Sequence, residues 1–229
     1  MNYYQAGYYL IKINKVDYGS LMNRELMTAS NCINESFFDD WSFSWTIEGE
    51  DKEKVSEEHG LTPEKINDLQ NWVDFKFEAN KIGWQNIFYS LDALEEYKEK
   101  FFKERTDLIK MGLSFSATET EDLLEAFEPR PENGGEIGIR HGLMQKLPEN
   151  PAGKFIGYDI IGVELDGTFH TIHCHDLQNE LESKFGLAFN ENGLIENCAT
   201  WKEVTDFCND PSNGLEPVPW YHCKVKIYE

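Results

Sequence analysis

The chain has 229 residues, 40% of them hydrophobic and 14% aromatic, and its 42 acidic and 21 basic side chains give a formal net charge of −21 at pH 7. This aromatic content argues against a disordered chain, and the negative field opposes binding to nucleic acid or anionic membranes and attracts basic partners. No apolar run of transmembrane length and no targeting leader is recognisable, so we expect a cytoplasmic protein. The acidity also has a simpler interpretation, because net charge keeps proteins in solution.

The cysteines show no close CxxC pair and are odd in number, which argues against a disulfide framework. We expect free thiols, mostly buried, at Cys32, Cys174, Cys198, Cys208 and Cys223.

Alternating apolar residues predict strands at residues 8–14, 41–47 and 108–116, and a short one at 86–89. The clearest half-buried strand is 41–47, because every second residue is a large apolar one: Trp41, Phe43, Trp45 and Ile47. Such a stripe most often packs under helices.

Helical spacing predicts three helices before residue 128. The first begins at Thr62 as N-cap with Pro63 in the first turn. Its apolar face comprises Ile66, Leu69, Val73 and Phe77. Ser90 caps the second, with Leu91, Leu94, Tyr97, Phe101 and Phe102 inward. A capping box at residues 118–121 opens the third.

A loop rich in proline and glycine at residues 128–135 is the best candidate for a subdomain boundary. Residues 136–140 then predict a short strand, in which Gly138 would let another backbone come close.

Two strands joined by a tight turn at Asp166-Gly167 are predicted for residues 155–175. The first arm is apolar on both faces, so we expect a central strand, with Ile160 and Ile161 on opposite faces. The second arm places Phe169, Thr171, His173 and His175 on one side and His170, Ile172 and Cys174 on the other.

The C-terminal part predicts a helix with Leu177, Leu181 and Phe185 on one face and Gly186 ending it, and a second helix after Thr200. A closing strand follows at residues 218–228. The expected fold is therefore a single α+β domain, residues 1–229, with a mainly antiparallel sheet and about four helices.

A metal site is the first enzymatic alternative, because His173 and His175 would point the same way from a strand, as HxH zinc or iron ligands do. Further ligands would come from Cys198, Cys208, His222 or Cys223, and we favour His222 and Cys223. A cysteine nucleophile, Cys174 or Cys223, is another option, but Cys174 would need a base other than its two neighbours.

Three runs lie in the C-terminal third of the chain: GYDIIGVELDGTFHTIHCHDLQNEL (157–181), GLAFNENGLI (186–195) and EPVPWYHCKVKIY (216–228). They resemble the C-terminal part of small acidic bacterial proteins that are grouped with the immunity proteins of toxin systems. The resemblance implies a stoichiometric inhibitor whose acidic surface docks a basic toxin, commonly a nuclease. It carries over no catalytic residue.

We therefore expect a binding protein for a basic protein partner rather than an enzyme, with no cofactor and no direct contact to nucleic acid or membrane. Two acidic segments are the expected contact surface: Glu48, Glu50, Asp51, Glu53, Glu57 and Glu58, and then Glu119, Glu121, Asp122 and Glu125. If the carboxylates form a continuous stripe, they would instead stand in for phosphates in a nucleic-acid mimic.

Overall fold

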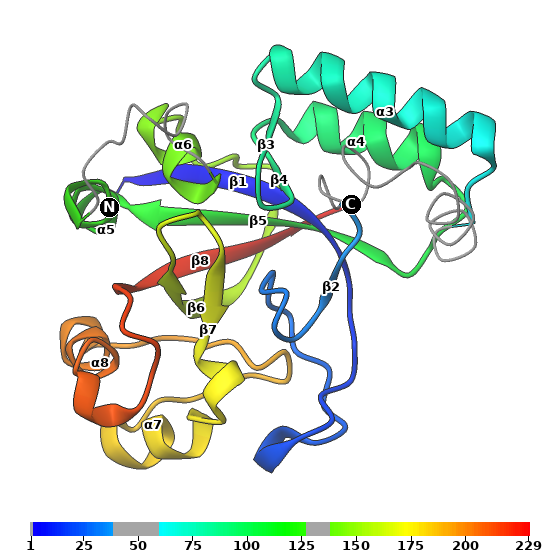
Figure 1. Ribbon diagram of the computed structural model, residues 1–229. Helices are drawn as coiled ribbons and strands as arrows, with labels where there is room; N and C mark the ends of the chain where they lie inside the picture. Colours follow the sequence, from blue (N-terminus) through cyan, green and yellow to red (C-terminus); the bar gives the residue numbers. More distant parts are fainter. Residues whose placement is uncertain (1, 39–59, 127–137) are drawn as a thin grey trace.

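The computed structural model describes residues 2–38, 60–126 and 138–229 (Figure 1). Within these ranges eight strands form one sheet in the order β3-β4-β1-β5-β8-β6-β7, with β2 paired to β1, and every pair is antiparallel. Six α-helices pack on this sheet. The predicted α+β architecture is confirmed, with two helices more than expected.

The strands are β1 (Tyr3–Lys12), β2 (Glu35–Ser36), β3 (Ile82–Gly83), β4 (Ile87–Phe88), β5 (Leu108–Ser116), β6 (Lys154–Val163), β7 (Phe169–Thr171) and β8 (Trp220–Tyr228). The α-helices are α3 (Pro63–Glu78), α4 (Leu91–Phe101), α5 (Ala117–Ala126), α6 (Gly138–Met144), α7 (Gln178–Phe185) and α8 (Trp201–Cys208). Short 3₁₀ turns lie at η1 (Gly19–Leu21), η3 (Ile172–His175) and η4 (Pro211–Asn213). None of these helices combines the length and the apolar composition needed to cross a bilayer.

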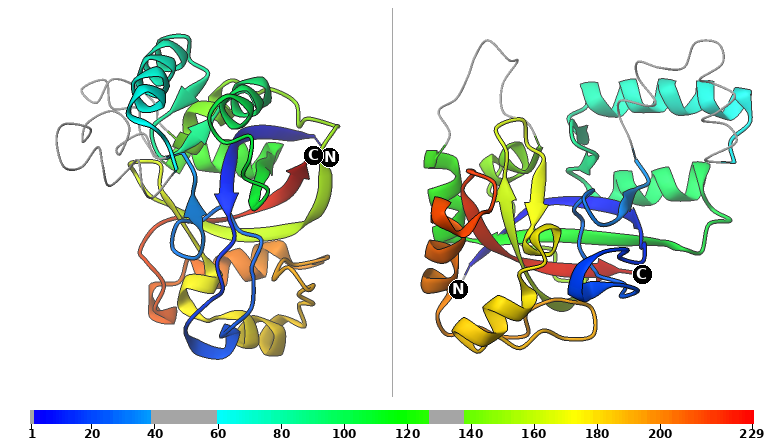
Figure 2. Two further views of the ribbon diagram at one scale, coloured as in Figure 1. Left: turned by 90° about the vertical axis from the view of Figure 1, so that its right-hand side faces the viewer. Right: turned by 60° about the horizontal axis from the view of Figure 1, so that its bottom comes forward.

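Helices cover both faces of the sheet. Beyond the irregularity between Gln5 and Gly7, the alternation along β1 sends Tyr9 and Ile11 to one face, which α5 and α6 cover. Tyr8 and Leu10 point to the opposite face, where α3 and α4 pack at one end (Figure 2). The other end of that second face is covered by α7 and α8, against Ile160 of β6.

We name the three packed regions by their helices. The α5–α6 core includes Met111, Leu113, Leu123, Ile139, Leu143, Ile161 and Val225. The α3–α4 core includes Phe37, Phe38, Ile66, Leu69, Phe88, Leu94 and Tyr97. The α7–α8 core includes Ile160, Ile172, Leu181, Ile195, Val204, Phe207 and Trp220.

The N-cap of α3 agrees with the prediction from local sequence, whereas the N-cap of α5 does not. Thr62 caps α3 as predicted, since its hydroxyl accepts the backbone N–H of Lys65 at 3.3 Å. By contrast, α5 begins before its predicted capping box, and Ser116 accepts the N–H of Glu119 at 3.2 Å instead of Thr118. The chain enters α5 directly from β5, so the last residue of the strand is the one placed to cap.

Phe77 was predicted on the buried face of α3, but it is 41% exposed and touches Trp84 edge-on. It occupies the last turn of α3, outside the α3–α4 core that Ile66, Leu69 and Val73 enter. Ser90 was predicted to cap α4, and it does occupy the position before the helix, but its side chain caps no backbone group.

The strand predicted at residues 136–140 is wrong where the structure describes it, because α6 begins at Gly138. Gly138 has φ +57°, and a Cβ there would lie 2.8 Å from Cα of Gly167. The expected close approach of another backbone is therefore confirmed, but it opens a helix. The predicted strand 41–47 and the predicted boundary 128–135 lie outside the described residues.

The hairpin of β6 and β7 is present, with a longer turn and a shorter second arm than predicted. Glu164 donates its N–H to the carbonyl of Thr168 at 2.8 Å, so three residues form the loop, and Gly167 supplies the positive φ of +88°. The first arm was expected to be a central strand, but the strand order places β6 next to the outermost strand β7, and β1, β5 and β8 occupy the centre of the sheet. Ile160 and Ile161 are both fully buried on opposite faces, as predicted.

Candidate functional site

The two predicted acidic segments differ in what the structure says of them. Residues 48–58, which hold Glu48, Glu50, Asp51, Glu53, Glu57 and Glu58, lie outside the described ranges. The second segment lies on α5, where Glu121, Asp122 and Glu125 are exposed. Glu119 is not a free surface charge, because its side chain is only 15% exposed and Oε1 lies 3.1 Å from Nδ1 of His222.

A groove of about 670 Å³ runs between α5, α8 and the start of β8. Two of the predicted acidic residues, Glu119 and Asp122, line it, while Glu121 and Glu125 do not. Asp206 of α8 contributes a third carboxylate, and it is hydrogen-bonded to Lys202 at 2.8 Å. Among the residues that the structure describes, the exposed carboxylate of Asp122 forms no ion pair, although Lys202 of the same groove, which is hydrogen-bonded to Asp206, interacts with it electrostatically. This charge is therefore available to a bound molecule.

Aromatic rings form the other part of this groove. Trp201 stacks on the imidazole of His222 with ring centroids 4.4 Å apart and planes 3° from parallel. Tyr158 meets Trp201 edge-on at 5.2 Å. Carboxylates beside aromatic faces are the surroundings that favour an ammonium or guanidinium group, which gains both charge pairing and a cation–π contact. We call this groove, defined by Glu119, Asp122, Tyr158, Trp201, Asp206 and His222, the acidic aromatic groove.

The histidines predicted to share one strand face do not do so. The strand ends at Thr171, and His173 and His175 lie in the 3₁₀ turn η3, where side chains no longer alternate. His173 is buried, with Nε2 at 2.9 Å from the carbonyl of Gly193. His175 instead contacts the carboxylate of Glu216.

The other two residues of the predicted metal set are also engaged elsewhere. His222 faces Glu119 and Trp201 in the acidic aromatic groove, and Cys223 is buried in the α5–α6 core on the opposite face of β8. His173, His175, His222 and Cys223 therefore do not assemble into one site. Cys198 and Cys208, the remaining candidates, belong to the α7–α8 core.

A different cysteine and histidine group does assemble. In the parts of the chain that the structure describes, three potential metal-ligand atoms come within 4.8 Å of one another at Cys32, His170 and Cys174 alone. Sγ of Cys32 lies 3.3 Å from Nδ1 of His170. Nε2 of the same ring lies 3.1 Å from Oε1 of Glu164. We call Cys32, His170 and Cys174 the Cys–His–Cys cluster.

The cluster exists because a long N-terminal loop docks on the hairpin. Ser30 donates its hydroxyl to the carbonyl of Phe169 at 3.1 Å, which holds Cys32 beside β7. Deeper in the interface, the carboxylate of Asp159 accepts the hydroxyls of Thr28 and Thr171, each at 2.7 Å. This buried carboxylate therefore fastens the loop, β6 and β7 together.

The 3₁₀ turn η3 brings Cys174, the third member of the Cys–His–Cys cluster, close to the other two. If the strand had continued, His170 and Cys174 would lie four residues, or about 13 Å, apart along it. The turn η3 folds the chain back, so their ligand atoms lie within 4.8 Å.

The three groups are electrostatically coupled. Hydrogen bonds from Cys174, Ser30 and His170 lower the pKa of Cys32 to about 5, although burial opposes this. The hydrogen bond to Cys32 and burial raise the pKa of the Cys174 thiol. Burial acts to lower the pKa of His170, but its contacts with Cys32 and Glu164 outweigh burial and raise it. The lowered pKa favours the thiolate form of Cys32 at neutral pH, with Cys174, Ser30 and His170 as its hydrogen-bonding neighbours.

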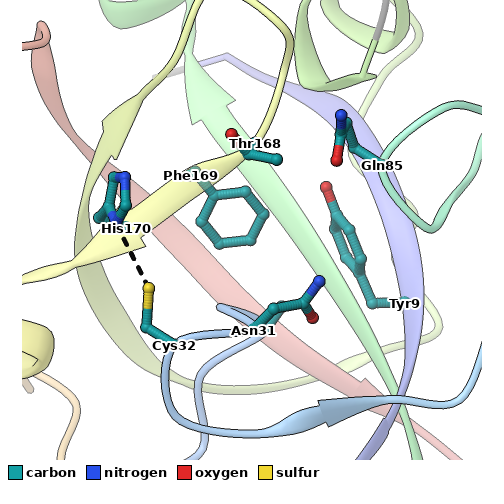
Figure 3. A pocket seen from close by; sticks show the side chains of 8 residues that line it. Tyr9, Asn31, Cys32, Gln85, Thr168, Phe169 and His170 are labelled. Atoms are coloured by element: carbon teal, nitrogen blue, oxygen red, sulfur yellow. Dashed lines mark hydrogen bonds between the residues drawn. The ribbon is translucent and has the colours of Figure 1, made fainter. Parts of the chain in front are cut away.

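A pocket of about 300 Å³ opens beside the cluster (Figure 3). Cys32 and His170 form one side of it, and the rings of Tyr9 and Phe169 lie across it. The other polar groups in the view are the amides of Asn31 and Gln85 and the hydroxyls of Thr168 and Tyr9. Cys32 was not singled out as a site residue from the sequence. The one local signal for it is that Cys32 lies in a polar stretch without hydrophobic periodicity, where a thiol can be accessible.

Comparison with protein-family models, with curated proteins and with solved structures found no match to this chain.

Proposed function

We propose that the protein is a binding protein that inhibits a basic protein partner, such as a nuclease toxin, and that the acidic aromatic groove receives a lysine or arginine side chain of this partner. The observation that carries the proposal is the exposed carboxylate of Asp122 at the rim of a groove that also holds Trp201. The resemblance to immunity proteins points the same way.

The charge of the whole chain supports the same proposal at longer range. A net charge of −21 attracts a cationic protein and raises its association rate, by a factor of about 10–10³ in favourable cases. Complementary charge acts mainly on association and orientation. The groove would then supply a local, desolvated contact, which is where binding energy concentrates.

The test begins with capture of the partner on the purified protein from the cells that encode it, at about 0.1 M salt and again at about 1 M, where the Debye length falls from about 10 Å to about 3 Å. We expect a basic protein that is retained at low salt and released at high salt. Recovery of no basic protein at low salt would contradict the proposal.

The groove is tested with the captured partner and a matched pair of charge variants. Asp122→Asn and Glu125→Gln remove the same charge from the same helix, but only Asp122 lines the groove. We expect Asp122→Asn to weaken binding about tenfold or more, because a hydrogen bond to a charged group contributes about 1.5–3 kcal/mol. Glu125→Gln should change the dissociation rate little. Equal effects of the two variants would mean that the negative charge of α5 attracts the partner but that the groove makes no specific contact with it.

Nucleic-acid mimicry is a variant of the same proposal. It requires the carboxylates of residues 48–58 to continue a stripe with those of α5, and it predicts that nucleic acid competes with the protein for the partner. A competition experiment with duplex DNA distinguishes the two, since a simple inhibitor outside the nucleic-acid site is not displaced.

A further inference from the structure

The Cys–His–Cys cluster has the donor atoms and the spacing of a zinc site. Zn²⁺ binds thiolate sulfur at about 2.3 Å and imidazole nitrogen at about 2.0–2.1 Å, so tetrahedral ligand atoms lie about 3.5–3.8 Å apart. The Sγ of Cys32 and Nδ1 of His170 are 3.3 Å apart, and all three ligand atoms lie within 4.8 Å of one another. Small side-chain shifts therefore suffice to surround an ion.

The imidazole is already oriented as a ligand. Zinc-bound histidines almost always donate their second ring N–H to a carboxylate, a carbonyl or water, which fixes the tautomer that ligates. Nε2 of His170 lies 3.1 Å from Oε1 of Glu164, so Nδ1 is left facing Cys32. The carboxylate of Glu216 lies 4.0 Å from Nδ1 but does not join the group of three.

The ligands come from three separately anchored segments. Cys32 lies on the loop that Ser30 ties to Phe169, His170 lies in β7, and Cys174 lies in η3. A site assembled in this way needs no rearrangement of the backbone on binding, and the ion would cross-link the N-terminal loop to the hairpin.

We propose that Cys32, His170 and Cys174 bind one Zn²⁺ ion, with a fourth coordination position left for water or a small ligand from the adjacent pocket. Two cysteines, one histidine and an open position are a ligand set of catalytic rather than purely structural zinc. Cys32 and His170 line the pocket of about 300 Å³, so the ion would lie at its wall. This site shares no lining residue with the acidic aromatic groove, and either function can fail without the other.

The first measurement is the zinc content of the full chain, purified without an affinity tag under a reductant that does not chelate metal, and the affinity of the stripped protein for Zn²⁺ in competition with a chromophoric chelator. We expect one ion per chain. Co²⁺ in place of Zn²⁺ should give the visible bands of a tetrahedral site and a thiolate charge-transfer band, which a purely carboxylate site does not show.

Single substitutions assign the ligands. Cys32→Ser and Cys174→Ser should each weaken zinc binding by more than 100-fold and reduce the thiolate band to about half. Glu164→Gln, which keeps the hydrogen bond but removes the charge, should weaken it about 10–100-fold. Cys198→Ser is the matched control, because Cys198 is a half-buried thiol that contacts Thr200 instead of the cluster.

Circular dichroism and thermal melting of the metal-free variants show whether each one is folded. A wild-type protein that binds no zinc after loading, or folded Cys32→Ser and Cys174→Ser variants that bind it as tightly as Cys198→Ser, would overturn the proposal.

Discussion

The strand β6 separates two cores, and this makes its stability contribution measurable residue by residue. Ile160 enters the α7–α8 core and Ile161 enters the α5–α6 core, and both side chains have 0% exposure. Truncation of a buried isoleucine to alanine costs about 2–5 kcal/mol, from lost transfer free energy and from the cavity left behind. Either loss is a large share of a typical stability of about 5–15 kcal/mol.

Urea denaturation measures both variants against a control in the same hairpin. With an m-value near the upper end of about 1–3 kcal/mol per molar urea, we expect the midpoints of Ile160→Ala and Ile161→Ala to fall by about 1–2 M. Leu165→Ala, at a side chain that is 42% exposed in the turn, should leave the midpoint almost unchanged. If both isoleucine variants unfold at the wild-type midpoint, β6 does not separate two packed layers and the architecture is wrong.

Three further predictions concern single contacts. Gly142→Ala should be strongly destabilising in thermal melts, because its Cβ would lie 1.6 Å from the carbonyl oxygen of Ala6 and α6 would have to move off the sheet; an unchanged Tm would contradict this packing. Two lysine contacts lower the pKa of Glu149 below its ordinary value of 4.5, so its contribution is present above that pH and is lost as the pH falls through the lowered pKa. The stability difference between wild type and Glu149→Gln should therefore shrink below pH 4.5, and a constant difference would refute the assignment. His173→Ala leaves the carbonyl of Gly193 without its partner and should cost about 1–3 kcal/mol in urea, whereas a neutral result would mean that this buried bond contributes nothing.

Elements whose signals are local were predictable. The closing strand β8, the hairpin arm β6 and the helix α7 with Gly186 at its end were all expected, because alternation, helical spacing and a glycine of φ +65° are properties of neighbouring residues. The prediction failed at α6, where a short apolar repeat fits a strand and a helix equally well. The geometry there is set by the contact of Gly138 with Gly167, which is not a local feature.

In the candidate sites too, the features set by neighbouring residues were predictable and the contacts between distant residues were not. The acidic face of α5 was predicted from composition, but its juxtaposition with Trp201 depends on how β5 and β8 pair. The predicted metal-ligand set is not brought together in the structure, because the prediction extended β7 through His173, whereas the chain enters the turn η3 after Thr171. Cys32 and His170 are 138 residues apart in sequence, and no periodicity connects them. Only the docking of the N-terminal loop brings them together.

The sheet ends in very short strands, and this bears on how copies of the protein behave toward one another. The outermost strands are β3, with two residues, and β7, with three. Before the residues that pair with β7, the side of β6 that faces away from β8 is covered at one point, where Tyr158 forms a backbone bridge with Ile195. Long unpaired edges are templates on which another chain can add a strand, and short or covered edges remove that template. In the described part of the chain the two outermost strands thus offer a second molecule rows of only two and three residues, so crowding at high concentration should not extend the sheet from β3 or β7.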